Sequence, residues 1–236
     1  MPFVPVLHAE WIKIRTLRSL LGALAAVLVV TVAFSAVTAA QADRSDPLYA
    51  VFFGVSLGQV AAVVFGALAV SGEYRGGALR LTLAAVPDRA RWFAAKAVAV
   101  ALPVLAVGLL TGLATLAVGR ATAGEPGPTW AEGLRGVVGC ALYLTLMALF
   151  AAGLAAVLRS GVGTLGLLIP FLLTVSFVVG DLASGAAGYL PDRAGQLALH
   201  SAPEGPLGPW TGLAVTALWA GAALGAGAWC VRRRDA

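Results

Sequence analysis

Six stretches of this sequence contain no lysine, arginine, aspartate or glutamate, and each is 19 to 23 residues long. A helix of about 20 apolar residues crosses the hydrocarbon core of a bilayer, where a charged side chain costs about 2.5–3.5 kcal/mol. Because lipid offers no hydrogen bonds, the backbone of such a stretch must satisfy its own polar groups, which predicts helices. The predicted spans are 20–40, 48–70, 97–118, 136–157, 162–180 and 209–231.

The composition excludes a water-soluble domain. Hydrophobic residues make up 60% of the 236 residues and charged residues only 11%, against about 25% charged residues in a soluble domain. Disorder is excluded as well, since it requires low hydrophobicity and high charge. The longest segments between predicted spans, 71–96 and 181–208, are too short for a separate soluble domain. We therefore expect a single all-α transmembrane domain over 1–236, a polytopic membrane protein with six transmembrane helices.

The charges of the loops predict the orientation. With the N-terminus in the cytoplasm, twelve lysines and arginines fall on the cytoplasmic side and four on the outer side. Cytoplasmic loops carry the excess of basic residues, so we expect both termini in the cytoplasm. The net charge of +5 then reflects sidedness and contact with lipids, and we expect no nucleic-acid partner. Arginine greatly outnumbers lysine, which is typical of a GC-rich genome and favours a bacterial plasma membrane.

The sequence lacks the residues that catalysis or ion coupling would need. No predicted span carries an Asp, Glu, Lys or Arg, whereas ion-coupled transporters usually keep an ionisable group in mid-membrane. His8 and His200 are predicted on opposite sides of the membrane, which excludes a dyad or a metal site between them. No Gly-Lys pair occurs, so a phosphate-binding loop of the GxxxxGK[ST] type is excluded. We expect no enzyme activity and no catalytic, cofactor or metal site on this chain.

The predicted cytoplasmic segment 71–96 has the pattern of a short surface helix. Gly76 and Gly77 end the preceding helix, 78–86 is rich in helix-forming residues, and Pro87 stops it. Its apolar face holds Leu79, Leu83 and Val86, and its basic flanks hold Arg75, Arg80, Arg89 and Arg91. Such a helix suits a groove on a partner protein. Its arginines would equally suit lipid headgroups at the membrane surface, and the residue pattern favours neither alternative.

Two further segments flank the predicted spans. Residues 1–19 are predicted to form an interfacial helix, the alternative being an ordinary basic flank that orients the first span. The apolar face of that helix holds Leu7, Trp11 and Ile14, and Glu10 interrupts it. Residues 181–208 are rich in Pro and Gly and are predicted to form an extracytoplasmic loop or a re-entrant hairpin, with a short helix over 192–200.

Seven residues of segment 71–96 form a pattern with a defined spacing. These residues are Glu73, Gly77, Leu79, Arg80, Pro87, Arg89 and Lys96. Their order resembles the first cytoplasmic loop of the ABC-2 type permeases, which reads Glu-x-x-x-Gly-Thr-Leu-Arg, then Pro-x-Arg, then a Lys at the start of the next helix. Ala78 stands where that family often has Thr. The opening sequence Glu-Trp-Ile-Lys-Ile-Arg at 10–15 also resembles the N-terminal interfacial helix of the family.

The resemblance implies the transmembrane permease subunit of an ABC-type exporter, with ATP bound on a separate ABC ATPase subunit. The permease would form a homodimer, or a heterodimer with a similar permease, and the ATPase would dock on the helix 78–86. The docking residues implied are Glu73, Arg75, Gly77, Leu79, Arg80, Leu83, Pro87 and Arg89. Arg159, between the fourth and fifth predicted spans, is either a second contact or part of a plain connector.

The neutral, apolar spans favour an amphipathic substrate over ions. Two alternative functions remain open from the sequence. One is a stand-alone membrane facilitator or channel, which would need no ATPase. The other is a membrane scaffold that transports nothing.

Overall fold

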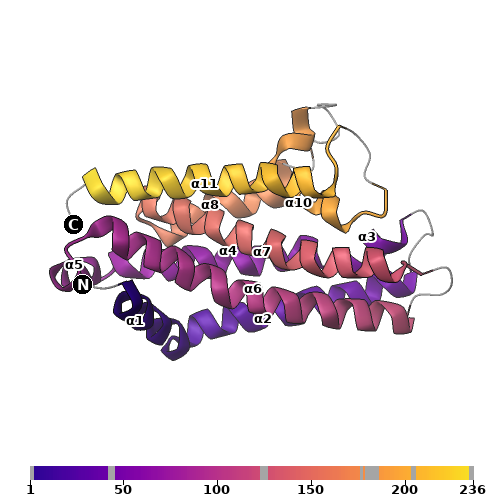
Figure 1. The fold of residues 1–236 in the computed structure, drawn as a ribbon, viewed down its shortest axis with the longest axis horizontal. Helices are drawn as coiled ribbons and strands as arrows, with labels where there is room; N and C mark the ends of the chain where they lie inside the picture. Colours follow the sequence, from indigo (N-terminus) through magenta and orange to yellow (C-terminus); the bar gives the residue numbers. More distant parts are fainter. Residues whose placement is uncertain are drawn as a thin grey trace.

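The computed structural model describes residues 3–41, 46–122, 127–175, 178, 186–202 and 206–233. Within these residues the chain is helical and contains no strand (Figure 1). The α-helices are α1 (Phe3–Thr16), α2 (Arg18–Gln41), α3 (Pro47–Phe52), α4 (Val55–Ser71), α5 (Ala78–Ala85), α6 (Arg89–Thr122), α7 (Trp130–Leu158), α8 (Gly161–Pro170), α10 (Pro191–Gln196) and α11 (Pro209–Arg233). Shorter turns are the 3-10 helices η1 (Gly72–Tyr74), η3 (Ala186–Tyr189) and η4 (Leu197–Leu199), and the π-helix η2 (Phe171–Val175).

Five of the described helices are long and apolar enough to cross a membrane. They are Arg18–Ala39, Val55–Tyr74, Arg89–Thr122, Trp130–Leu158 and Pro209–Arg233. The prediction of an all-helical, multi-pass membrane protein is confirmed at this level. The fifth predicted span, 162–180, lies partly outside the described residues. Its described part is a shorter apolar helix over Gly161–Thr174, so the number of six spans stays a prediction.

The predicted span 48–70 is not one helix but two, because the chain turns at Phe53 and Gly54 between α3 and α4. At this turn the Gly54 amide donates a hydrogen bond to the Ser35 hydroxyl of α2 (3.1 Å). A side chain on Gly54 would overlap the backbone carbonyl of Thr31. The break therefore lets the backbones of α2 and α4 come into direct contact at the start of α4. The absence of charged residues, on which the predicted span rests, does not indicate such a break.

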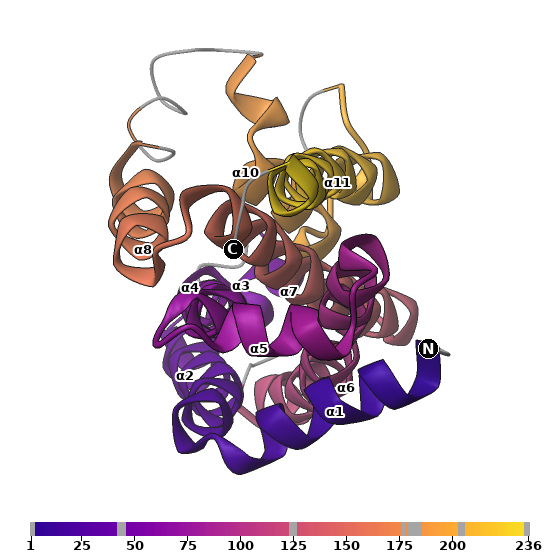
Figure 2. The ribbon, with the colours of Figure 1, turned by 90° about the vertical axis from the view of Figure 1, so that its left-hand side faces the viewer.

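α7 lies in the middle of the bundle and packs against α4, α6 and α11 (Figure 2). Small residues make these contacts close. Gly66 of α4 lies against the backbone of Ala148, and Gly153 of α7 lies against that of Ala223 in α11. Helices in lipid associate mainly through such packing, because the lipid tails are as apolar as the side chains. The bundle is thus built around the small residues of α7.

The two ends of the bundle differ. α1 and α5 lie across one end, which we call the α1/α5 end (Figure 2). The described chain begins at this end with Phe3, and α11 finishes there at Arg233 (Figure 1). α3 and α10 lie towards the other end, the α3/α10 end. Both ends of the described chain therefore lie at the same end of the bundle, while the side of the membrane that this end faces stays a prediction.

At the α3/α10 end, Asp46 ties the segment 186–202 to the start of α3. Its carboxylate accepts hydrogen bonds from the amides of Tyr49 and Ser201 (both 3.0 Å) and lies 2.8 Å from Nδ1 of His200. Burial acts to raise the pKa of Asp46, but these hydrogen bonds outweigh it and hold the pKa below its ordinary value. The short helix predicted in this segment is α10 followed by η4, which pack against α11 and α7.

The contact between α4 and α7 predicts a stability difference between two glycine variants. Gly66→Ala would push a methyl group into the Ala148 carbonyl, and overpacking of this kind costs about 1–3 kcal/mol. No heavy atom lies within 4 Å of where a Cβ would stand on Gly221 of α11. Gly221→Ala should therefore leave stability unchanged or raise it slightly, because alanine favours helix over glycine. Thermal unfolding in detergent measures both, and equal melting temperatures for the two variants would contradict the close contact.

Candidate functional site

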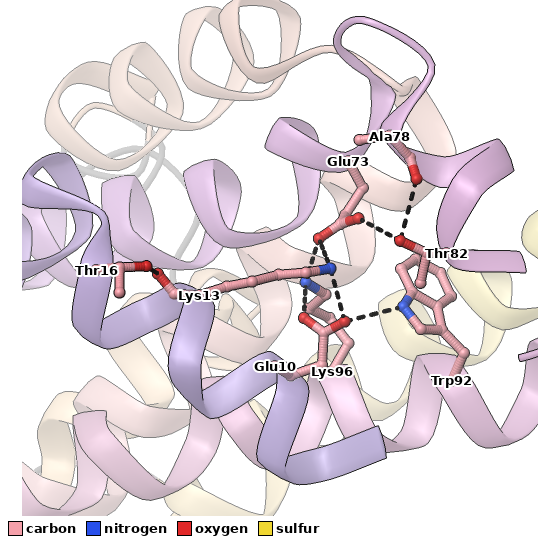
Figure 3. A network of polar contacts seen from close by, with 8 residues as sticks. All are labelled: Glu10, Lys13, Thr16, Glu73, Ala78, Thr82, Trp92 and Lys96. Carbon is pink, nitrogen blue, oxygen red and sulfur yellow. Dashed lines mark hydrogen bonds and ion pairs between the residues drawn. The ribbon is translucent and has the colours of Figure 1, made fainter. Parts of the chain in front are cut away.

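Four charged side chains from three elements meet at the α1/α5 end (Figure 3). They are Glu10 and Lys13 of α1, Glu73 of η1 and Lys96 of α6. The Lys96 ammonium forms ion pairs with both carboxylates, at 2.7 Å from Glu73 Oε1. The Lys13 ammonium also reaches both, at 3.0 Å from Glu10 and 2.8 Å from Glu73. We call these four residues the charge cluster.

The charge cluster is balanced and mostly buried. The exposed fraction is 2% for Glu10, 5% for Glu73 and 3% for Lys96. An isolated buried charge is strongly destabilising, whereas a buried pair persists when each charge is matched and hydrogen-bonded. Two carboxylates here face two ammonium groups, so the cluster has no net charge. The arrangement explains why charged residues are tolerated beside the apolar spans α4 and α6.

Neutral donors complete the charge cluster. Trp92 lies on α6, one helical turn before Lys96. Its indole Nε1 donates a hydrogen bond to Glu10 (3.2 Å). The Thr82 hydroxyl of α5 lies 3.4 Å from Glu73 Oε2, a weak contact, and donates to the Ala78 carbonyl (3.0 Å). Four elements, α1, η1, α5 and α6, thus converge on two carboxylates.

The buried face of α1 explains how Glu10 reaches α6. Val6, Glu10 and Ile14 follow each other at intervals of four, and all three are buried. The sequence pattern predicts an apolar face of Leu7, Trp11 and Ile14 with Glu10 as an interruption. In the structure α1 is turned so that Glu10 is the centre of the buried face, while Trp11 is exposed.

Lys13 is the accessible member of the charge cluster, with 37% of its side chain exposed. Burial acts to lower its pKa, but the hydrogen bond to Glu73 and the negative charges of Glu10 and Glu73 outweigh burial. The pKa of Lys13 therefore lies above its ordinary value. Lys13 stays charged, and keeps α1 attached to η1, throughout the neutral range.

α5 covers the charge cluster from the outside. Gly76 and Gly77 have positive φ angles of 62° and 75°, which favour glycine and bend the chain from η1 into α5. Leu79 is buried, and Leu83 is half-buried and packs against the core. The face that we expected to meet a partner therefore packs onto the bundle itself. The outward face presents Leu81, which is 76% exposed, beside the exposed Arg80.

A hollow of about 430 Å³ lies beside α5 and brings four of the predicted docking residues together with Arg159, the predicted second contact. Its lining is Glu73, Tyr74, Gly77, Leu79, Arg80 and Arg159. The Arg159 guanidinium lies 5.6 Å from the centre of the Tyr74 ring, within reach of a cation–π contact. Arg159 also ends α7 with a φ of 52°. The structure thus places Arg159 next to the α5 segment, although the two are far apart in the sequence.

The remaining predicted docking residues lie at the two ends of α5. Arg75 and Pro87 are exposed. Arg89 is half-buried and donates a hydrogen bond to the Val231 carbonyl (3.0 Å), which links the start of α6 to the end of α11. Glu73, Leu79 and Arg89 therefore hold the site together from within, whereas Arg75, Arg80 and Pro87 lie on its surface.

Comparison with known proteins adds no assignment. No protein-family model matches this chain, and no curated protein matches it.

The charge cluster predicts a large loss of stability for Lys96→Met. Removal of the ammonium leaves two buried carboxylates without their main partner, which costs about 3–5 kcal/mol. Lys13→Met removes the same charge from a half-exposed position and should cost clearly less, because water replaces the lost partner. Thermal unfolding of the purified variants in detergent measures both effects.

A double variant controls for lost packing. Lys96→Met combined with Glu73→Gln should recover part of the stability lost by Lys96→Met alone, since it removes one of the uncompensated charges. Strictly additive losses in the double variant would show that the ion pair contributes nothing.

Proposed function

We propose that this chain is the transmembrane permease subunit of an ABC-type exporter of the ABC-2 kind. A separate ABC ATPase binds at the α1/α5 end, which is the cytoplasmic end, and ATP acts on that partner. The observation that carries the proposal is α5, a short helix that lies across the end of the bundle with Leu81 and Arg80 outward and the charge cluster beneath it.

The surface of α5 supports a protein partner. An exposed apolar side chain with basic neighbours suits a groove on a partner protein. Leu81 supplies the apolar contact, Arg80 and Arg159 supply positive charge at the hollow beside α5, and Arg75 is exposed just before α5. Small exposed residues, Ala84 and Ala85, continue the same face, so a partner can approach the helix closely.

The attachment of α5 supports the transmission of movement. A partner shifts a conformational equilibrium only if it binds the two conformations differently. η1 directly continues α4, and through Glu73 it holds Lys96 of α6 and Lys13 of α1. A displacement of α5 by the ATPase would therefore act on α4, α6 and α1 together. The exporter would use this link to move the bundle between two packings.

The course of the chain supports six crossings with both termini in the cytoplasm. Tyr143 of α7 lies near Thr216 of α11, where both contact Gly195, and Gly153 lies near Ala223. α7 and α11 therefore run in the same direction, and the chain between them has to return along the bundle. We propose that α8 begins this return as the fifth crossing.

The proposed assembly contains two permeases in a bacterial plasma membrane, either two copies or this chain with a similar one, each with its ATPase. The substrate is an amphipathic molecule, because the spans provide no charged path. The alternative function, a stand-alone facilitator or channel, would need no partner on α5.

Leu81→Asp is expected to detach the ATPase. The expected partner is an ABC ATPase encoded by a neighbouring gene, co-expressed with the tagged chain. The aspartate places an acid beside Arg80 on the docking face, so co-purification of the ATPase should fall by about tenfold or more, a loss of about 1.4 kcal/mol. Leu81→Met keeps the apolar contact and serves as the matched control, with co-purification near the wild-type level.

Both variants should elute and unfold like the wild type, because Leu81 is exposed. Retention of the ATPase by Leu81→Asp would overturn the docking site. Transport of an amphipathic dye into sealed vesicles by the chain alone, without ATPase or ATP, would support the facilitator instead.

A further inference from the structure

A cavity of about 680 Å³ lies towards the α3/α10 end, away from α5. It is an open cavity lined by the end of α3 and the start of α4, by the π-helix η2, and by the segment that carries α10 and η4. Its lining is Tyr49, Phe53, Ser56, Leu57, Gln59, Leu172, Leu173, Gly188, Tyr189, Asp192, Arg193, Gln196, Leu197, His200, Pro206 and Leu207. The volume lies within the range of small-molecule sites, about 300–1,000 Å³.

Three lining residues, Ser56, Gln59 and Gln196, are connected by hydrogen bonds that run through the buried Tyr143 behind them. The Ser56 hydroxyl donates to Gln196 Oε1 (3.0 Å), and Gln196 Nε2 donates to the Tyr143 hydroxyl (3.2 Å). Tyr143 in turn donates to Gln59, whose own Nε2 donates to the Ser56 carbonyl (2.8 Å). Because each amide is oriented by its neighbours, the polar groups stand ready for a ligand without rearrangement.

The charges of the lining select against a strongly charged ligand. The lining contains one carboxylate, on the buried Asp192, and one guanidinium, on Arg193. These formal charges cancel. The other polar groups are amides, hydroxyls, phenols and one imidazole, which both donate and accept hydrogen bonds. Such groups match hydroxyls, which also do both.

The rest of the lining is apolar and aromatic. Phe53, Leu57, Leu172 and Leu173 come from the α3–α4 turn, α4 and η2. A pocket that is mostly apolar with a few convergent polar groups binds one end of a ligand by hydrogen bonds and the other by burial. The two parts of this cavity thus fit the two parts of an amphipathic molecule.

We propose that this cavity binds an amphipathic molecule with an uncharged, hydroxyl-bearing head and an apolar body. The head lies against Ser56, Gln59 and Gln196, and the body lies against the leucines of α4 and η2. Binding is a property of this chain alone. Only the role of the ligand as transported cargo rests on the proposed function.

Three probes with the same eight-carbon tail test the chemistry of the head. Octyl glucoside is neutral and carries hydroxyls, octyltrimethylammonium is a cation, and octyl sulfate is an anion. Equilibrium dialysis of each labelled probe against the full chain in phosphatidylcholine nanodiscs, with empty discs subtracted, measures binding. Octyl glucoside should bind saturably and about tenfold more tightly than either charged probe. Equal binding of all three, or no excess over empty discs, would overturn the proposal.

Two matched glycine variants locate the binding. Gly188 lines the cavity, Gly221 lies outside it on α11, and neither has a heavy atom within 4 Å of where a Cβ would stand. Gly188→Trp places a large side chain at the wall of the cavity and should weaken octyl glucoside binding by about tenfold or more. Gly221→Trp should bind like the wild type. Equal binding by the two variants would mean that the probe binds elsewhere.

A third variant separates this proposal from the proposed function. Leu81→Asp changes the opposite end of the bundle and should bind octyl glucoside like the wild type even when the ATPase is lost. Conversely, Gly188→Trp should keep the ATPase.

Adding a monoglucosyl diacylglycerol to the discs identifies the source of the ligand. Competition with octyl glucoside supports a lipid from the membrane, and saturable binding without competition supports a molecule from water.

Discussion

The Lys96 ammonium, held between the carboxylates of Glu10 and Glu73, is the contact on which the α1/α5 end depends. A charge at the edge of an apolar bundle needs opposite charges nearby, and two separate elements, α1 and η1, supply them. The same requirement fixes the rotation of α1, since only one face can turn Glu10 towards α6. It also fixes the place of η1, and through η1 the place of α5. This electrostatic condition, together with the packing of Leu79 and Leu83 on the core, sets the arrangement of the surface that we propose for docking.

The contacts of α7 with α4 and α11 depend on shape and not on charge. Gly66, Ala148, Gly153 and Ala223 let α4, α7 and α11 approach at backbone distance. This packing leaves the two ends free to specialise. One end has a basic surface helix over a buried charge cluster, and the other has a neutral cavity with an ordered polar wall. In the exporter that we propose, energy would enter at the first of these places and cargo would be held at the second, and they lie towards opposite ends of the bundle.

The long helices could be predicted from the sequence because a charge in lipid costs much free energy. Membrane-spanning segments therefore stand out as long stretches without charged residues. The sequence did not predict the turn at Phe53 and Gly54, because a turn buried against another helix needs no charge. The sequence identified an apolar stripe on α5 but not the surface that the stripe contacts. Leu79 and Leu83 could pack equally well on the bundle or on another protein. The charge cluster was also missed, although its residues were noted singly. Glu10 and Lys96 pair only after α1 folds back, which no local spacing encodes.

The four residues of the charge cluster are synthesised at different times, which bears on how the α1/α5 end assembles. Glu10 and Lys13 leave the ribosome long before Glu73 and Lys96, so α1 emerges with a carboxylate that has only its helical neighbour to balance it. Until α6 has been made, that carboxylate lacks the ammonium of Lys96 and the indole of Trp92, and the ion pair between Lys13 and Glu73 is the cluster's only link between α1 and η1. The complete charge cluster can therefore form only when η1, at the end of α4, and α6 are both in place. A chain truncated before α6 would lack both groups of α6 that hold the Glu10 carboxylate, the Lys96 ammonium and the Trp92 indole.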